Sequence, residues 1–495
     1  MPQSPTVEVP KRWPLAAEPQ NRSTSPLQDS RLVNCFVEKN DQGEFEIFKR
    51  PGLVLAANFS PNNIGYGVFH SSGYNYVVCG TGAPSGVLLK SGSAISYPIA
   101  VNNSVYRFNE VFDETDSGYG TSVDPYVWLD NGTGNAFLTT GAYVVNANFN
   151  TVANVVDSNF PAIGALVGRV KGSAYLDGTL YVGAGNQVFG SNIDTPTAWS
   201  ALNVLIAQSF ADRIVFVSKQ LTYVVVLKQW STEIFYDADN ATGSPLAGVQ
   251  SANLNIGCFN QNTVQEIEDK IIWVSASKVT GPKVYVLQNL IPTPVSTPPI
   301  ERLLRNWSNA DTTGFVIYTT VWKCDGHTFY ILTNATANLT LVYDLDQGVW
   351  SQWTYNGGCW PMISSCYDET NNYHVMQHAS NGNCYYMSLD YYSDAGLPIV
   401  VDIITPNFDA GVRRKKFLKQ IEFVCDQVQG AIQHRYTDND YQSWSEFEQT
   451  PLGATDGNFT TDQGSFRRRA YNFRYVGNTP FRLQSAEIML DLGTL

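Results

Sequence analysis

A turn followed by a short strand recurs along most of this sequence, and this repeat constrains the fold more than any other feature. Each copy begins with Gly, Asp or Asn and continues with aromatic or β-branched residues, as in residues 177–182 and 325–331. The copies centre near residues 72, 131, 177, 220, 269, 325 and 381, at spacings of 43 to 59 residues. Four antiparallel strands joined by hairpins need roughly 40–50 residues. The period therefore predicts a β-propeller with six or seven blades, because a β-sandwich has turns every ~8–12 residues and no longer period.

The composition agrees with an all-β fold. Charged residues make up 15% of the chain, against about 25% in ordinary soluble proteins, whereas aromatic residues reach 13%. Helical periodicity is absent over any useful length, and residues 301–305 allow one or two turns at most. No apolar run approaches the ~18–20 residues that a membrane-spanning helix needs.

Changes in composition divide the chain into three parts. Residues 1–50 begin with a proline-rich segment, which predicts an extended arm, and continue with the alternating residues 44–48. Residues 51–400 hold the repeat and form the propeller body. Residues 401–495 contain cleanly alternating segments such as 467–475, which predict a separate sandwich-like β domain. We call this domain the platform and expect it to include the first N-terminal strands.

The N-terminal arm contains two apolar residues, Trp13 and Leu15, among its prolines. One interpretation is a solvated tail. The alternative is an arm that lies along the body or along a neighbouring subunit, because a solvated tail has no need of these side chains.

The negative charge is concentrated before the platform. Residues 1–400 carry 20 Lys and Arg against 32 Asp and Glu, whereas residues 401–495 carry 11 against 12. An acidic body argues against a protein that grips DNA, since such proteins neutralise phosphates with basic side chains. Residues 108–124 hold an acidic run without Lys or Arg, predicted to be a long loop that either faces a channel or lies on the outer rim; its acidic residues are Glu110, Asp113, Glu114, Asp116 and Asp124.

Two basic runs stand out in the platform, residues 467–469 and the quartet Arg413, Arg414, Lys415 and Lys416. Nucleic acid is one conceivable partner. We favour exposed strand edges, or a face that meets an acidic protein.

Motifs for catalysis and cofactors are weak. The glycine-rich segments 80–82 and 183–185 do not open a helix in a βαβ unit, so they predict hairpin turns rather than nucleotide sites. The best metal candidate is the set Cys366, His374, His378 and Cys384, whose spacing matches no common zinc module. We therefore expect no cofactor and no metal, with all eight cysteines as free thiols.

Propellers also include glycosidases, and residues 437–444 look like a degraded sialidase-type Asp-box. A sialidase needs an arginine cluster for its substrate carboxylate, but residues 51–400 hold few arginines: Arg107, Arg169, Arg213, Arg302 and Arg305. A carbohydrate-active or host-surface-binding propeller is thus the alternative function, and we expect no enzymatic activity.

Taken in order, several segments resemble the tail nozzle (hub) proteins of short-tailed double-stranded-DNA phages, also called packaged-DNA stabilisation proteins. The similar segments extend over more than 400 residues and include RLVNCF (31–36), KRPGL (49–53), SNIDTPTAW (191–199), STEIFY (231–236), STPPIE (296–301), GHTFY (326–330) and FRRR (466–469).

The resemblance implies a structural virion protein without catalytic residues. It implies a homo-oligomer, a hexameric ring below the portal and the tail adaptor, which retains packaged DNA and conducts it during ejection without sequence-specific binding. Tail fibres, tailspikes or needle proteins are further implied partners, and assembly is expected in the host cytoplasm. On this reading the basic quartet meets the adaptor, and Trp13 and Leu15 contact a neighbouring subunit.

Overall fold

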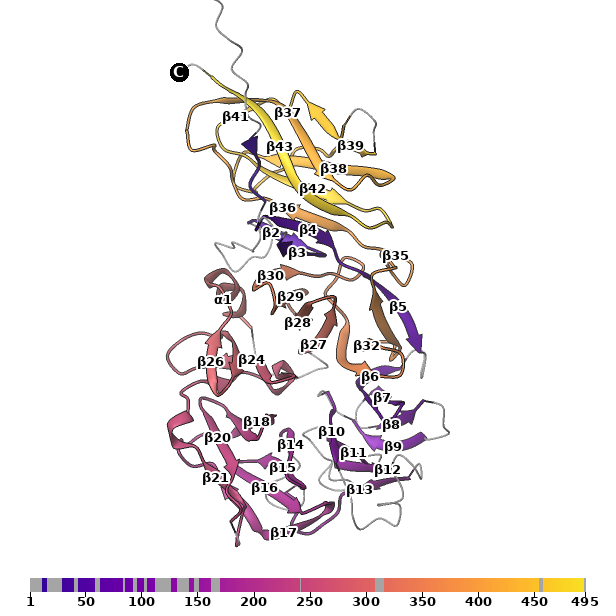
Figure 1. The fold of residues 1–495 in the computed structure, drawn as a ribbon, viewed down its shortest axis with the longest axis vertical. Coiled ribbons are helices and arrows are strands. Elements are labelled where there is room, and N and C mark those ends of the chain that lie inside the picture. Colours follow the sequence, from indigo (N-terminus) through magenta and orange to yellow (C-terminus); the bar gives the residue numbers. More distant parts are fainter. Residues whose placement is uncertain are drawn as a thin grey trace, which may run out of the picture.

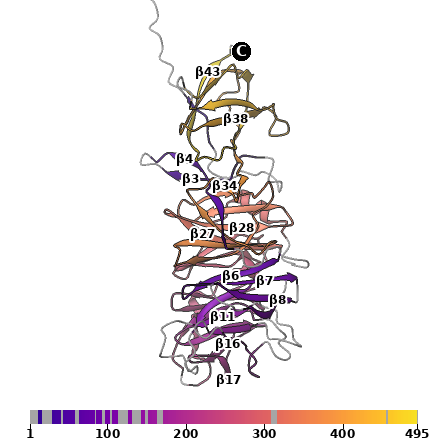
Figure 2. The same ribbon diagram turned by 90° about the vertical axis from the view of Figure 1, so that its right-hand side faces the viewer.

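The computed structural model describes residues 11–15, 29–39, 43–57, 63–82, 85–91, 96–101, 105–111, 126–130, 142–146, 151–161, 170–240, 242–307, 316–453 and 457–493. Within these residues nearly all regular structure is β, and the single α-helix is α1 (Pro298–Leu304). The predicted all-β class is confirmed. Figure 1 shows a ring of sheets with a second β domain beyond one edge, and Figure 2 shows the same arrangement from the side.

The first four blades of the propeller are four-stranded antiparallel sheets made of consecutive strands. Blade one is β6 (Ile64–Ser71), β7 (Tyr74–Gly82), β8 (Ser85–Lys90) and β9 (Ser96–Ala100). Blade two is β10 (Arg107–Val111), β11 (Tyr126–Asp130), β12 (Ala142–Asn146) and β13 (Thr151–Asn154). Blade three is β14 (Ser173–Leu176), β15 (Thr179–Ala184), β16 (Gln187–Asn192) and β17 (Thr195–Ile206). Blade four is β18 (Ile214–Gln220), β19 (Tyr223–Lys228), β20 (Thr232–Asp237) and β21 (Leu246–Gly248).

Three further blades complete the ring, so the described residues form seven. In blade five, β22 (Gly257–Cys258) and β23 (Gln265–Ile267) both pair with β24 (Lys270–Ala276), followed by β25 (Val284–Gln288) and β26 (Ile291–Pro294). Blade six is β27 (Ile317–Cys324), β28 (His327–Asn334), β29 (Leu339–Asp344) and β30 (Val349–Gln352). Blade seven joins β31 (Met362–Asp368), β32 (Tyr373–His378) and β33 (Cys384–Ser388) to the N-terminal strand β5 (Gly52–Ala57).

The ring closes through its first strands and through β5. The first strands of successive blades contact one another around the centre, and β31 contacts β6. Strand β5 pairs antiparallel with β33, so a strand from the beginning of the chain completes the last blade. This pairing leaves no open end in the ring of blades.

The repeated aromatic and β-branched residues form the middle strands of the blades. Each middle strand has blades on both sides, so its two faces are covered and apolar side chains fill both. All six residues of β15 are buried, and so are all six of β29. Hydrophobic residues on both faces, rather than strict alternation, are what such positions require.

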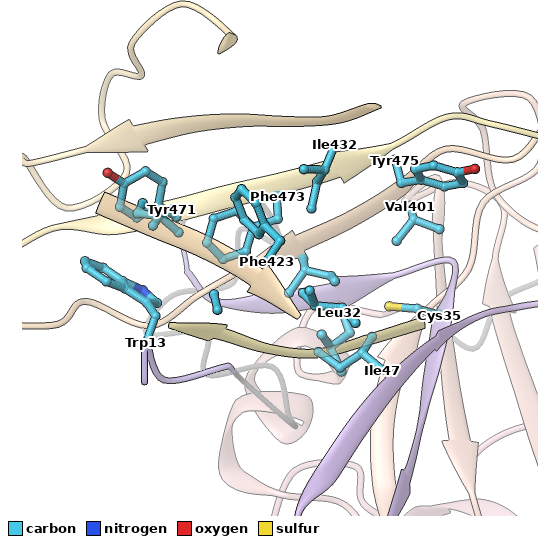
Figure 3. Close-up of a cluster of buried hydrophobic side chains, with 14 of the residues drawn as sticks. Trp13, Leu32, Cys35, Ile47, Val401, Phe423, Ile432, Tyr471, Phe473 and Tyr475 are labelled. Carbon is cyan, nitrogen blue, oxygen red and sulfur yellow. The ribbon is translucent and has the colours of Figure 1, made fainter. Parts of the chain in front are cut away.

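The platform is made from the C-terminal region together with N-terminal strands, as predicted. One sheet has the order β3 (Cys35–Lys39), β4 (Phe45–Lys49), β43 (Arg482–Leu492), β37 (Lys416–Cys425) and β40 (Phe459–Thr461); β1 (Lys11–Arg12) and β41 (Ser465–Phe466) pair at its margins. The facing strands are β2 (Arg31–Val33), β36 (Val401–Ile404), β42 (Ala470–Tyr475), β38 (Gly430–Thr437) and β39 (Glu448–Leu452). A shared core lies between them, with Leu32, Ile432 and Phe473 among its buried residues (Figure 3).

One sheet is common to the platform and the propeller. Strand β2 pairs in parallel with β30 of blade six and antiparallel with β36 of the platform. The result is a nine-stranded sheet that runs from β27 to β39. Continuous backbone hydrogen bonds across this sheet join the two domains more firmly than a flexible linker would.

Candidate functional surfaces

The junction between propeller and platform is built around a buried arginine. Arg50 is fully buried and forms a two-pronged ion pair with Asp394 of β34 (Ser393–Asp394), with Nη1–Oδ1 and Nη2–Oδ2 distances of 2.8 and 2.5 Å. Its Nε donates to Oδ1 of Asn34 at 3.1 Å, and its guanidinium lies 4.9 Å from the Trp360 ring centroid. Because a buried charge is tolerated only when it is well paired, this network fixes the geometry of the junction.

Asn34 connects the same network to both domains. It adopts a left-handed backbone conformation, with φ of 56°, between β2 and β3. Its amide donates to the carbonyl of Val400 at 2.8 Å, and its Oδ1 accepts from the backbone N of Thr354 at 2.7 Å. Asparagine tolerates this conformation better than most residues and supplies both a donor and an acceptor.

Trp13 lies in the core of its own chain, which corrects the expected subunit contact. Strand β1 pairs with β43, and the indole is 2% exposed and packs against Phe408. It also packs against Tyr471 (Figure 3). Its Nε1 donates to Oγ1 of Thr405 at 3.0 Å. Leu15 is partly buried against the same core. The arm is therefore anchored within the platform, as far as residues 11–15 are concerned.

The four residues of the basic quartet differ in their exposure to solvent. Arg413, Arg414 and Lys415 are exposed, and Arg414 donates to the carbonyl oxygen of Gly493. Lys416 is buried, and its Nζ donates to three backbone carbonyls, including that of Arg467 at 2.7 Å. Only the first three residues are thus available to a partner. We call them the basic triplet.

The cysteines and histidines of the metal candidate lie on opposite faces of blade seven. Cys366 pairs with Val375 and Cys384 pairs with Gln377, so both thiols share the face of these residues. His374 and His378 point to the other face, where burial lowers the pKa of each imidazole to about 4. Among the described residues no group of three or more ligand side chains is placed to hold a metal ion. All eight cysteines are described, and none forms a disulfide.

The acidic run is only partly described. Residues 108–111 belong to β10 and not to a loop, and Glu110 is paired with Val127 of β11. The remaining candidates, Asp113, Glu114, Asp116 and Asp124, lie outside the described residues.

The centre of the propeller is narrow. A cavity of about 200 Å³ is lined by first strands of the blades, including Arg107 of β10 and Phe216 of β18. The Arg107 guanidinium lies 5.2 Å from the Phe216 ring centroid and donates to the carbonyl of Gln261 at 2.9 Å. A water molecule needs about 30 Å³, so this space holds a few waters and no nucleic acid duplex.

The two sides of the propeller differ in charge. Because the strands of a blade are antiparallel, its first and third turns lie on one side, and its second turn and the connection to the next blade lie on the other. Acidic residues predominate over basic ones in the described first and third turns; they are Asp177, Asp194, Asp237, Asp239, Glu268, Asp269, Asp325, Asp346 and Glu369, against Lys219, Lys270 and Lys323 nearby. We call this side the acidic face.

Basic residues predominate on the opposite side, which we call the basic face. Its exposed or partly exposed members in the described residues are Lys171, Arg213, Lys278, Lys283, Arg302 and Arg305, against Asp157, Asp212 and Glu301. Reasoning from the sequence missed this polarity because it appears only when each turn is assigned to a side.

Comparison with known proteins identifies the family. The family model described as bacteriophage P22 Gp10, beta-propeller (Phage_stabilise), matches residues 126–390, from β11 to just after β33. This match spans more than half of the chain. The chain belongs to this family. The resemblance inferred from the sequence is thereby confirmed, and so is the propeller fold.

Family membership makes this a structural, virion-associated phage protein. A comparison with curated proteins finds no match. Similar solved structures include the N-terminal domain of Nup159, with 9% identity, 72% of this chain and 98% of that chain covered, and a TM-score of 0.39. The computationally designed Ika8 protein has 10% identity, coverages of 68% and 100%, and a TM-score of 0.37. No helix in the described residues is long and apolar enough to span a membrane.

Proposed function

We propose that this chain is the tail nozzle, or hub, subunit of a short-tailed phage. Copies assemble as a hexameric ring beneath the portal and the tail adaptor, retain the packaged genome, and conduct it during ejection. The observation that carries the proposal is the nine-stranded sheet that joins a phage-family propeller to the platform. A subunit that bears pressurised DNA needs its domains fixed to one another, and this sheet together with the Arg50 network provides that connection.

Charge supports a DNA path along the ring rather than a DNA-binding role. The chain has a net charge of −13, so a surface made from it would repel the duplex and let it slide. The duplex cannot use the axis of an individual propeller, whose cavity is only about 200 Å³. The path is therefore proposed to lie between copies, at the centre of the ring.

Particles assembled with and without this chain test the proposal. Heads filled with DNA and lacking the chain are expected to lose their genome, and added purified protein should restore retention and infectivity. Retained DNA and normal ejection in the absence of the chain would contradict the proposed role.

A further inference from the structure

A large cleft opens on the acidic face among blades five, six and seven. Its volume is about 900 Å³, and its lining includes Asp325, Asp346 and Tyr367, a residue that is 45% exposed. Lys323 also lines the cleft but is neutralised by an ion pair with Glu268. Asp325 and Asp346 form no salt bridge within the described residues. Carboxylates beside an exposed tyrosine ring are suited to an ammonium or guanidinium group.

A projecting loop lies on the basic face of the same molecule. Residues 277–283 join β24 to β25, and we refer to residues 277–282 as the loop. Ser277 Oγ shapes it by accepting from the backbone N of Val279 at 3.2 Å and of Thr280 at 3.3 Å. Lys278 is exposed, and Val279 is 92% exposed, more than any other large hydrophobic residue in the described part of the chain.

The cleft and the loop lie at opposite ends of β24. The cleft is lined by residues 265–268, directly before this strand, and the loop follows directly after it. A seven-residue strand spans about 23 Å, so the two features are on opposite sides of the propeller. A loop and a cleft in this arrangement cannot meet within one chain, but they can meet between two copies.

We propose that the loop 277–282 of one copy enters the cleft on the acidic face of a second copy, with Lys278 directed to Asp325 and Asp346. Copies with a net charge of −13 repel each other unless oppositely charged patches meet, and this chain presents one such pair. Each copy then uses both patches, which gives a head-to-tail contact that closes into a ring when the rotation permits. The inference rests on the proposed ring of copies.

Matched variants of the full chain test the contact. The loop variant combines Lys278→Glu with Val279→Asp, and the cleft variant combines Asp325→Asn with Asp346→Asn. The control combines Asp177→Asn with Asp239→Asn, which removes the same charge from the acidic face outside the cleft. Asparagine is the chosen replacement because Asp325, Asp177 and Asp239 all have positive φ, a backbone conformation that asparagine tolerates.

Sedimentation velocity over a range of protein and salt concentrations is the measurement. We expect salt-sensitive assembly of the wild-type chain, association weakened about tenfold or more in the loop and cleft variants, and wild-type behaviour in the control. A mixture of loop and cleft variants should stop at dimers, since only one intact loop and one intact cleft remain to pair. Unchanged thermal unfolding of each variant shows that the fold is intact.

A wild-type chain that stays monomeric at low salt, or variants that assemble normally, would overturn the contact. The experiments distinguish a failure of the loop–cleft contact from a failure of the nozzle function. If the variants still form rings and retain DNA, the nozzle function stands without this contact. If the contact is found but particles without the chain keep their genome, the contact stands without the nozzle function.

Discussion

The Arg50 side chain ties together segments that are far apart in the sequence. Its partner Asp394 is 344 positions away, and the guanidinium also donates to the carbonyl of Thr354 at 2.9 Å. The motif at residues 49–53 is visible in the sequence, but local patterns carry no information about a partner at that separation. The sequence therefore marks residues 49–53 as a motif but does not indicate that Arg50 pairs with Asp394.

Replacing Arg50 with Ala is expected to destabilise the chain by about 3–5 kcal/mol, because Asp394 would be left as an unpaired buried charge. Chemical denaturation measures the change. A double variant with Arg50→Met and Asp394→Leu should lose much less stability, since no buried charge remains. Equal losses in the two variants would argue against this explanation.

His327 makes the junction sensitive to pH. Its Nδ1 lies 2.6 Å from Asp344, and its Nε2 lies 3.4 Å from Glu38 on the platform strand β3. Burial alone would lower the pKa of His327, but the hydrogen bond and charge of Asp344, aided by Glu38, raise it above the usual 6.5. The protonated form is therefore favoured in the folded chain.

A raised folded pKa means that the stabilising contribution is fully present below pH 6.5 and is lost as the pH rises through the folded value. We expect the difference in unfolding free energy between the wild type and His327→Gln to shrink as the pH rises from 6.5 through the folded pKa of His327. Denaturant titrations at several pH values measure this difference. A difference that is constant with pH would show that His327 acts only through packing.

Among the strands, hairpins could be predicted from the sequence, whereas long-range pairings could not. The period correctly indicated blades because each hairpin is local in the sequence. Two predicted turn centres, near 131 and 381, belong to the second hairpin of their blades rather than the first. Strand β5, which closes the ring, and strand β2, which joins the two domains, pair with strands more than 300 residues away. Local sequence patterns therefore could not predict either pairing.

Two changes in the N-terminal arm test whether Trp13 anchors it in the platform core. Trp13→Ala is expected to cost about 3–5 kcal/mol, because it empties a large site in the platform core. Trp13→Phe keeps an aromatic ring in this site and should cost less, although it removes the hydrogen bond to Thr405. Denaturant midpoints check both, and a stable Trp13→Ala variant would contradict the anchor.

The basic triplet is expected to bind the adaptor. Changing Arg413, Arg414 and Lys415 to Gln should weaken attachment about tenfold at low ionic strength and little at high ionic strength, since exposed charges are screened by salt. Lys416 is left unchanged because it is buried. Attachment of purified chain to adaptor rings is the measurement.

A matched control changes three exposed basic residues of the propeller, Arg213, Lys219 and Arg305, to Gln. Its attachment should equal that of the wild type. Equal weakening by both variants would mean that net charge, and not the triplet, governs the encounter.

The topology of the propeller places its acidic turns on one side of the ring and its basic turns on the other. The segment that joins β10 to β11 is a first turn, so its ends are on the acidic face. Replacing Asp113, Glu114 and Asp116 with Lys would attract DNA if the part of this face formed by blade two, away from the cleft, borders the path. We then expect slower genome ejection, most strongly at low salt. Ejection at the wild-type rate across a salt series would place the segment away from the DNA.

Electron cryomicroscopy of the purified virion tail would show whether copies of this chain form the nozzle ring through which the genome leaves. We expect a sixfold ring below the adaptor, with the platform toward the adaptor, the propellers around a central channel, and that channel between copies. A single copy, or a position at the periphery among the fibres, would rule out the nozzle role.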